Sequence, residues 1–250
     1  MATELQVLAL LVVLVAFVVT LLVRRRRPTP LRPIDAYKVA PTLAAASIEA
    51  GQPLHIGLGG IGPGENDTVL ALVAAEVAYY TSLPATVGDV SPIYTTSQTE
   101  MIPLAVDTLQ RAYNARHMLE GYHPVNVRWY PSGQRALAYA GAVSTLPGDD
   151  RLASNVLIGR FGPELALMLD ASERYNVPSI AYSTELTGQA VAYALADHAL
   201  IGDEVYNAGA YLSGRANLTN RSLTLDLLRW VLVFVMFVLF LINLIQQAGG

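Results

Sequence analysis

The chain has 250 residues, no cysteine and a formal charge of −4 at neutral pH. The lack of cysteine excludes disulfides, thiolate metal sites and a cysteine nucleophile. Lys38 is the single lysine and no Gly-Lys-Ser/Thr triplet occurs, which excludes a P-loop nucleoside triphosphatase. Hydrophobic residues make up 53% of the chain and the mean hydropathy is +0.39. Because soluble domains are less apolar, membrane-spanning segments are expected.

An uncharged apolar stretch of eighteen residues covers positions 6–23. This length is about the shortest that crosses a bilayer core as a helix. Four arginines follow it directly, whereas a cleaved signal peptide carries its positive charge before the apolar stretch. We therefore predict an uncleaved transmembrane helix over residues 1–23 and a basic linker over residues 24–34. Because arginines stay on the cytoplasmic side, the N-terminus is expected outside the cell.

A second apolar stretch covers residues 230–245. Three arginines lie between positions 215 and 229, and the tail after the stretch carries no charge. This bias again predicts that the preceding side is cytoplasmic. Residues 223–250 are therefore predicted to form a second transmembrane helix with a short tail outside. Residues 35–222 then form the cytoplasmic domain of a two-pass protein of the cell membrane.

The segment between the two apolar stretches is acidic. From Pro33 to Ser222 it has ten basic and eighteen acidic residues, a net charge of −8. This balance disfavours nucleic acid as a partner, because surfaces that bind nucleic acid are basic. The arginines beside the apolar stretches fit anionic lipid headgroups. The expected partners are the lipid bilayer, further copies of the chain as a homo-oligomer, and another membrane protein complex.

Strand-like and helix-like patterns alternate along the domain. In chain order we expect a helix over 35–50, a strand over 53–57, a helix over 67–81, a strand over 85–88, a helix over 99–117, a strand over 125–130, a helix over 134–144, a strand over 155–159, a helix over 163–175, a strand over 178–182 and a helix over 185–200. This alternation predicts an α/β fold with a Rossmann-like, doubly wound and mostly parallel sheet.

A glycine-rich loop follows the first predicted strand. The run Gly57-Leu58-Gly59-Gly60-Ile61-Gly62 contains the spacing Gly-x-Gly-x-x-Gly shortly before a predicted helix. Such glycines let a backbone turn sharply and approach a pyrophosphate, and an acid after the next strand binds the ribose hydroxyls. A nucleotide is therefore the candidate cofactor. The candidate cofactor-binding residues are Gly57, Gly59, Gly60, Gly62, Asp89 and Arg160.

Three features disagree with a dinucleotide site. Pro63 and Gly64 follow the third glycine, where a helix should already have begun. Glu65 and Asp67 bring negative charge to the place that a phosphate would occupy. Asp89 comes 27 residues after the third glycine, whereas the usual gap is about 20. The alternative interpretation is a tight strand-to-helix turn capped by Asn66 or Asp67.

Other polar residues follow the later predicted strands. Because the carboxyl ends of parallel strands share one edge, where ligands bind, we expect Asp67, Asp89, Arg160, Glu164 and Glu185 to converge. Three of these carboxylates, those of Asp67, Asp89 and Glu164, would suit a hard divalent cation. Acids at helix starts also complement the helix dipole, which is the competing explanation. No histidine has metal-site spacing, and no catalytic set is identified.

Three stretches carry a family resemblance: His55–Gly59, Asn155–Gly162 (NVLIGRFG) and Ala196–Leu212 (ADHALIGDEVYNAGAYL). They resemble a family of bacterial and archaeal membrane-anchored proteins that is defined as a domain of unknown function. The resemblance implies a membrane-tethered domain and implies no chemistry.

These features lead to three hypotheses. The first is a self-assembling structural or scaffold protein, with a ligand at the carboxyl edge of the sheet. In it, Tyr206 and Tyr211 either contact another copy or pack the last helix. The second is a nucleotide-binding enzyme or sensor that uses the Gly57–Gly64 loop, in which Gly59→Val would remove binding and leave the fold intact. The third is a regulator of a partner membrane complex that binds a small molecule or a cation.

Overall fold

The computed structural model describes residues 33–64, 67–213 and 232, and Pro33–Ser213 forms one compact unit. Both predicted membrane spans lie outside the described residues except for Leu232, as do Glu65 and Asn66. Among the described residues, one helix, Thr68–Ala85, is long and apolar enough to cross a bilayer. Half of that helix is buried inside the domain, where it contributes to the core.

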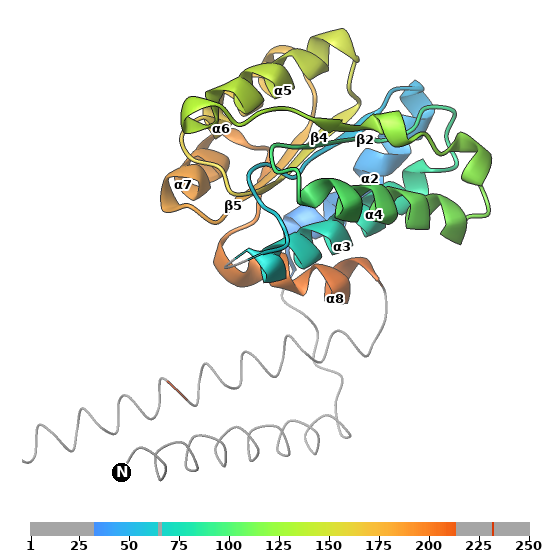
Figure 1. Cartoon of the computed structure of the whole chain (residues 1–250), viewed down its shortest axis with the longest axis horizontal. Helices are drawn as coiled ribbons and strands as arrows, with labels where there is room; N and C mark the ends of the chain where they lie inside the picture. Colours follow the sequence, from blue (N-terminus) through green and yellow to red (C-terminus); the bar gives the residue numbers. More distant parts are fainter. Residues whose placement is uncertain (1–32, 65–66, 214–231, 233–250) are drawn as a thin grey trace, which may run out of the picture. The chain divides into compact units, whose positions relative to one another are not determined.

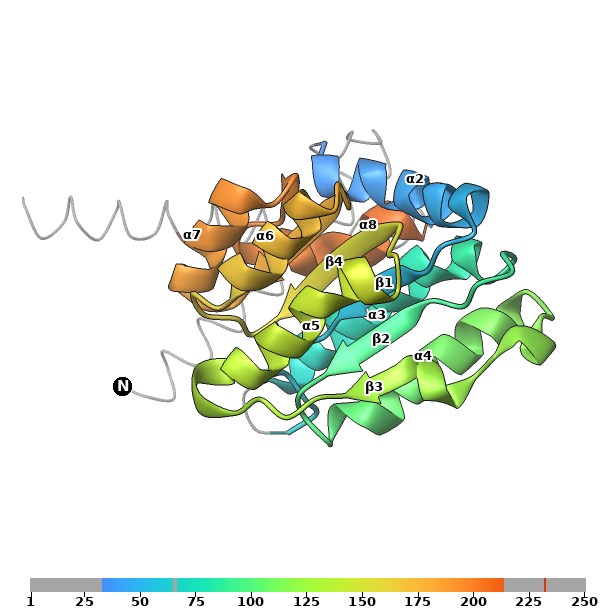
Figure 2. The same cartoon turned by 90° about the horizontal axis from the view of Figure 1, so that it is seen from above.

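Six parallel strands form one sheet in the order β3-β2-β1-β4-β5-β6 (Figures 1 and 2). The strands are β1 (Leu54–Gly57), β2 (Ile93–Thr96), β3 (Val127–Trp129), β4 (Ser154–Gly159), β5 (Ser179–Ser183) and β6 (His198–Ala199). This is the strand order of doubly wound dinucleotide-binding folds. The predicted α/β class with a parallel sheet is therefore confirmed.

Helices cover both faces of the sheet (Figure 2). One face carries α2 (Asp35–Ala50), α3 (Thr68–Ala85), α4 (Met101–Ala115) and α8 (Ala208–Leu212). The other face carries α5 (Leu137–Asp149), α6 (Leu165–Arg174) and α7 (Leu186–Leu195). Short 3-10 turns complete the described chain: η1 (Leu119–Gly121), η2 (Pro124–Asn126), η3 (Gln134–Ala136) and η4 (Gly202–Asn207).

Side chains alternate between the two faces along each strand, as the pleat requires. Ile56, Tyr94 and Val156 belong to the core beneath α2, α3 and α4. Their neighbours in sequence point to the opposite face, and three of these, His55, Thr95 and Asn155, are polar and fully buried. The two faces of the central strands are thus unequal, one apolar and one partly polar.

Two predicted elements are wrong. Residues 85–88 are not a strand, because α3 continues to Ala85 and a turn follows it before β2. The apolar run was too short to separate a strand from the end of a buried helix. The helix predicted over 185–200 ends at Leu195, because the Asp197 carboxylate accepts hydrogen bonds from the N–H and the hydroxyl of Ser179. This contact sets the chain beside β5, where it forms β6.

Candidate functional site

The loops after β1 and β4 separate at the carboxyl edge of the sheet, which is where doubly wound folds bind ligands. A cleft of about 680 Å³ lies at this edge. It is lined by loops that follow β1 to β5 and by the first residues of α5 and α6. A smaller hollow of about 360 Å³ adjoins it and shares Gly60, Gln98 and Arg160 with the cleft.

The glycine loop is held against the strand next to it. The N–H of Leu58 donates to the carbonyl of Thr95, and the N–H of Ser97 donates to the carbonyl of Gly59. The N–H of Gly59 donates to the hydroxyl of Tyr139, at 3.3 Å. Two of the N–H groups that a phosphate would need are therefore already satisfied inside the protein.

Gly59 must be glycine for a reason of packing. Its φ is +51°, in the left-handed region, and a Cβ atom there would lie 2.5 Å from the ring of Phe161. Phe161 follows β4 and is buried at the place where the loops after β1 and β4 part. This supports the interpretation of the loop as a structural turn, and the binding roles of Gly57, Gly59, Gly60 and Gly62 stay predictions.

Arg160 and Asp67 form an ion pair across this edge. Arg160 comes from the loop after β4, and Asp67 immediately precedes α3. The pair joins two of the residues that the sequence places at the carboxyl edge. It also puts a carboxylate beside the N-terminus of α3, where a dinucleotide fold would hold its pyrophosphate.

Glu164 and Glu185 bring two carboxylates together at Gly162. The N–H of Gly162 donates to Oε1 of Glu164 at 2.6 Å. A Cβ atom on Gly162 would lie 2.7 Å from Oε2 of Glu164 and 3.3 Å from Oε2 of Glu185. Both side chains line the cleft, and Glu164 is only 9% exposed. A glycine at position 162 therefore leaves room for both carboxylates.

The opposite wall of the cleft contains strained backbone. Arg135 and Ala136 have φ values of +51° and +52°, although neither is glycine. Left-handed backbone costs a non-glycine residue about 1–2 kcal/mol, and such strain concentrates at functional sites. Sequence reasoning did not find this wall. The turn residues Pro131, Ser132 and Gly133 after β3 were the one available signal.

A buried polar chain lies beneath the cleft. His55 contacts Asn155 through Nδ1 at 2.7 Å and Thr95 through Nε2 at 2.9 Å. The Thr95 hydroxyl contacts the hydroxyl of Tyr139 at 2.8 Å, and Asn155 donates to Ser172 at 2.8 Å. Burial lowers the pKa of His55 to about 4 and raises the pKa of Tyr139 to about 12. Both groups are therefore neutral near pH 7. These hydrogen-bonded side chains contact the Gly59 loop through the Tyr139 hydroxyl.

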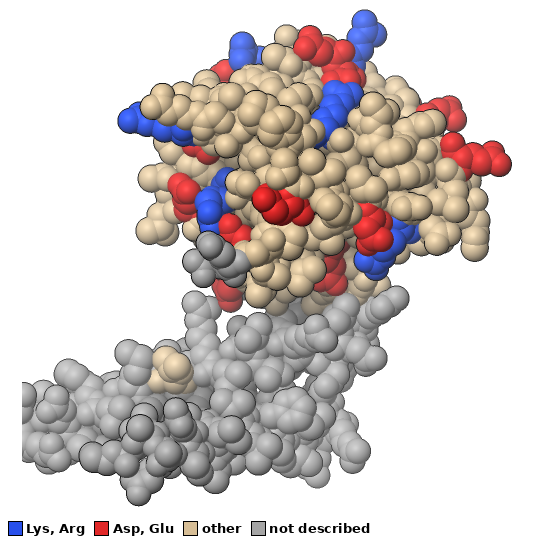
Figure 3. All heavy atoms as spheres, in the orientation of Figure 1, with Lys and Arg blue, Asp and Glu red and all other residues tan. Residues whose placement is uncertain are grey.

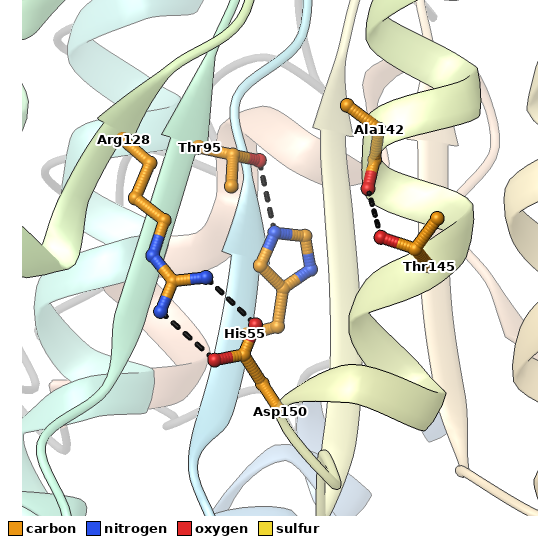
Figure 4. A network of polar contacts seen from close by, with 6 residues as sticks. All are labelled: His55, Thr95, Arg128, Ala142, Thr145 and Asp150. Carbon is orange, nitrogen blue, oxygen red and sulfur yellow. Dashed lines mark hydrogen bonds and ion pairs between the residues drawn. The ribbon is translucent and has the colours of Figure 1, made fainter.

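Arg128 and Asp150 pair beside this chain, as Figure 4 shows. Two guanidinium nitrogens donate to the two carboxylate oxygens at 2.7 and 2.9 Å. Because the guanidinium accompanies the ionised carboxylate, it lowers the pKa of Asp150. The pair ties β3 to the end of α5.

Asp89 does not join the glycine loop, which corrects the sequence prediction. It lines a separate hollow with Gly51, Pro53 and Asp150, at the amino end of β1. The predicted position depended on a strand over 85–88, which does not exist. The cation set of Asp67, Asp89 and Glu164 therefore does not converge. Among the described residues no cluster of three or more metal-binding side chains occurs.

On the face that Figure 3 draws, acidic and basic side chains of the described residues are interspersed. That face shows no broad basic area of the kind that binds a nucleic-acid backbone.

The comparisons with known proteins bring one match. A family model described as Domain of unknown function (DUF6754) matches residues 2–249. No curated protein and no solved structure matches the chain.

Proposed function

The chain belongs to the DUF6754 family, and we propose that it is a membrane-anchored α/β domain whose cleft binds a small zwitterionic molecule. The observation that carries the proposal is the opposite charge at the two ends of one cleft. Arg135 follows β3, whereas Glu185 follows β5. Because these strands lie on opposite sides of β1, the two side chains lie toward opposite ends of the cleft.

The charges in the cleft are mostly unmatched. Among the described residues Arg135, Glu164 and Glu185 form no ion pair. The Glu164 carboxylate accepts the N–H of Gly162 and lies at the start of α6, but no cation pairs with it among the described residues. A ligand with an ammonium or guanidinium group near the glutamates and a carboxylate or phosphate near Arg135 supplies both partners. A ligand of one sign would be repelled at one end.

The cleft also has an apolar wall. Leu137 and Leu167 are half exposed and line it together with Pro163 and Ala166. Covering such surface contributes about 25 cal/mol for each Å² that is removed from water. The expected ligand therefore has an apolar body between its charged groups, as an amino acid with a large side chain or a short peptide does.

A nucleotide fits this cleft less well. Dinucleotide folds hold the pyrophosphate at the N-terminus of the first helix after β1. Here Asp67 precedes that helix and is paired with Arg160, and Glu164 and Glu185 add negative charge nearby. A nucleotide would have to approach all three carboxylates. The nucleotide-binding sensor or enzyme is therefore kept as the competing outcome of the binding test.

Membrane anchoring is supported by the sequence on both sides of the domain. The apolar stretches at residues 6–23 and 230–245 are long enough, or nearly so, to cross a bilayer. Arginines flank both stretches on the side of the domain, which supports a two-pass protein with a cytoplasmic domain. Resistance of the full chain to alkaline carbonate extraction tests this part of the proposal.

Ligand binding is tested on the full chain in mild detergent. Thermal unfolding is measured with a panel of amino acids and dipeptides and, separately, with nucleotides and nucleoside phosphates. We expect a zwitterion with an apolar side chain to raise the unfolding temperature, and Glu185→Gln to remove the effect. A rise with nucleotides alone, or with no member of the panel, would overturn the proposal.

Self-assembly is a second candidate role, favoured by the outer face of α7. Leu186 and Tyr193, two helical turns apart, are 84% and 78% exposed. Exposed apolar side chains this close together favour a protein contact. Mass photometry should show oligomers of the wild type and smaller species for a Leu186→Glu, Tyr193→Glu double variant. Val125→Glu, at another exposed apolar position, is the control. A wild type that is monomeric at all concentrations would rule out this role.

A further inference from the structure

The chain enters and leaves the domain at the same place. Tyr37, near the start of α2, stacks on Tyr211 of α8 with ring centroids 5.4 Å apart. The Tyr37 hydroxyl donates to the carbonyls of Glu204 and Val205 in η4, each at 3.1 Å. Ile34 is buried in the same core. The first and last described helices are therefore fastened together, and Tyr211 packs within the domain.

Exposed apolar residues lie beside this place. Val69 and Leu72, one helical turn apart on α3, are 63% and 56% exposed. Ile201 and Tyr206 are also exposed and belong to η4 and the residue before it. Both α8 and η4 pack against α3, as Figure 1 shows for α8. We call Val69, Leu72, Ile201 and Tyr206 the α3–η4 surface.

We propose that the α3–η4 surface lies on the lipid bilayer, with its apolar side chains at the level of the headgroups. This inference rests on the proposed membrane anchoring. The nine residues 24–32 between the domain and the first apolar stretch cover at most about 30 Å even when fully extended. The side of the domain where the chain enters and leaves is thus held close to the membrane.

The chemistry of the surface fits a bilayer. Valine, leucine and isoleucine side chains on a helix bury themselves at the boundary between headgroups and acyl chains. Tyrosine is enriched at that level because it has an apolar ring and a polar tip. The arginines at positions 24–27 come directly after the first apolar stretch, where anionic headgroups attract them.

This placement connects the membrane with the cleft. Asp67 precedes Val69 by two residues and pairs with Arg160, which lines the cleft. A bilayer that contacts the start of α3 therefore lies near one mouth of the ligand site. The proposed ligand would reach the cleft from the cytoplasm beside the membrane surface.

The lack of cysteine makes a direct test simple, since one cysteine can be introduced and labelled alone. Leu72→Cys and Leu119→Cys are each labelled with a small fluorophore in the full chain. Leu119 is the matched control, because it is also a leucine, is 48% exposed, and lies in η1 beyond the far end of α4. The proteins are reconstituted in vesicles of phosphatidylcholine and phosphatidylglycerol, with or without bromine on the acyl chains.

We expect brominated lipid to quench the label at position 72 several-fold more strongly than the label at position 119. Equal quenching at both positions, in protein that stays in the membrane after carbonate extraction, would overturn this inference and leave the anchoring intact. Release by carbonate would instead overturn the anchoring itself. Burial of the position-72 label that depends on protein density and not on bromine would assign the surface to a second copy and overturn the bilayer contact.

Discussion

The guanidinium of Arg160 pairs with the carboxylate of Asp67, although the two residues are 93 positions apart in the chain. The pair links the loop after β4 to the start of α3 at the point where the loops of the sheet separate. Arg160 lines the main cleft and the smaller hollow beside it. A ligand whose acidic group displaced the Asp67 carboxylate from Arg160 would therefore change both the cleft and the hollow.

Replacing Arg160 should affect binding more than stability. Arg160→Gln removes a positive charge from the cleft and leaves Asp67 unpaired, so we expect the affinity for a zwitterionic ligand to fall about tenfold or more. The free energy of unfolding should change by only about 0–1 kcal/mol, because Arg160 is partly exposed. Arg174→Gln, which breaks an exposed pair with Asp170, is the control for both measurements. Unchanged affinity in Arg160→Gln would show that the Arg160 charge has no role in ligand binding.

Substitutions at Arg135 and Ala136 separate the effect of charge on ligand binding from the effect of backbone strain on stability. Arg135→Gly and Ala136→Gly both place glycine where φ is positive, so each relieves about 1 kcal/mol of backbone strain. Neither variant should be less stable than the wild type by more than about 0.5–1 kcal/mol, the entropic cost of glycine. Arg135→Gly alone should lose ligand binding in calorimetry. Equal affinities of the two variants would show that the Arg135 charge has no role.

Gly59 should be required for the fold. Gly59→Ala forces alanine to adopt a φ of +51° with its Cβ against Phe161, so we expect a loss of about 2–4 kcal/mol in the free energy of unfolding. The clash with Phe161 argues against the hypothesis that Gly59→Val would leave the fold intact. Gly141→Ala is the control, because nothing lies within 4 Å of its added Cβ. Urea unfolding in detergent should show that control to be at least as stable as the wild type.

Stability should fall with decreasing pH because of His55. Burial lowers its pKa from 6.5 to about 4 in the folded protein. Between these values the unfolded chain binds a proton that the folded protein does not, so stability is full above pH 6.5 and is lost toward pH 4. The loss amounts to about 3 kcal/mol. The slope should flatten in His55→Gln and persist in His123→Gln, which keeps His55. An equally steep slope in His55→Gln would contradict this origin.

The sequence predicted the parallel sheet because strand and helix patterns alternate along the domain, which leaves few other arrangements. It missed β6, which has two residues and depends on the contact between Asp197 and Ser179. It displaced the second strand because the residues after Pro84 resemble a strand locally, while the helix is extended by packing. Asp89 was misplaced as a direct result.

The candidate site was predicted in part. Arg160, Glu164 and Glu185 were expected at the carboxyl edge because each follows a strand, and all three line the cleft. Arg135 was missed, since left-handed backbone in arginine and alanine leaves no trace in composition or spacing. The packing of Phe161 on Gly59 was equally invisible, because it joins residues about a hundred positions apart.

Native mass spectrometry of the full chain, released from its own membranes, tests the central claim most directly. The account predicts a bound small molecule with both an acidic and a basic group, present in the wild type and in Ala136→Gly and absent from Arg135→Gly. A bound nucleotide, or a wild type that carries no ligand, would contradict it.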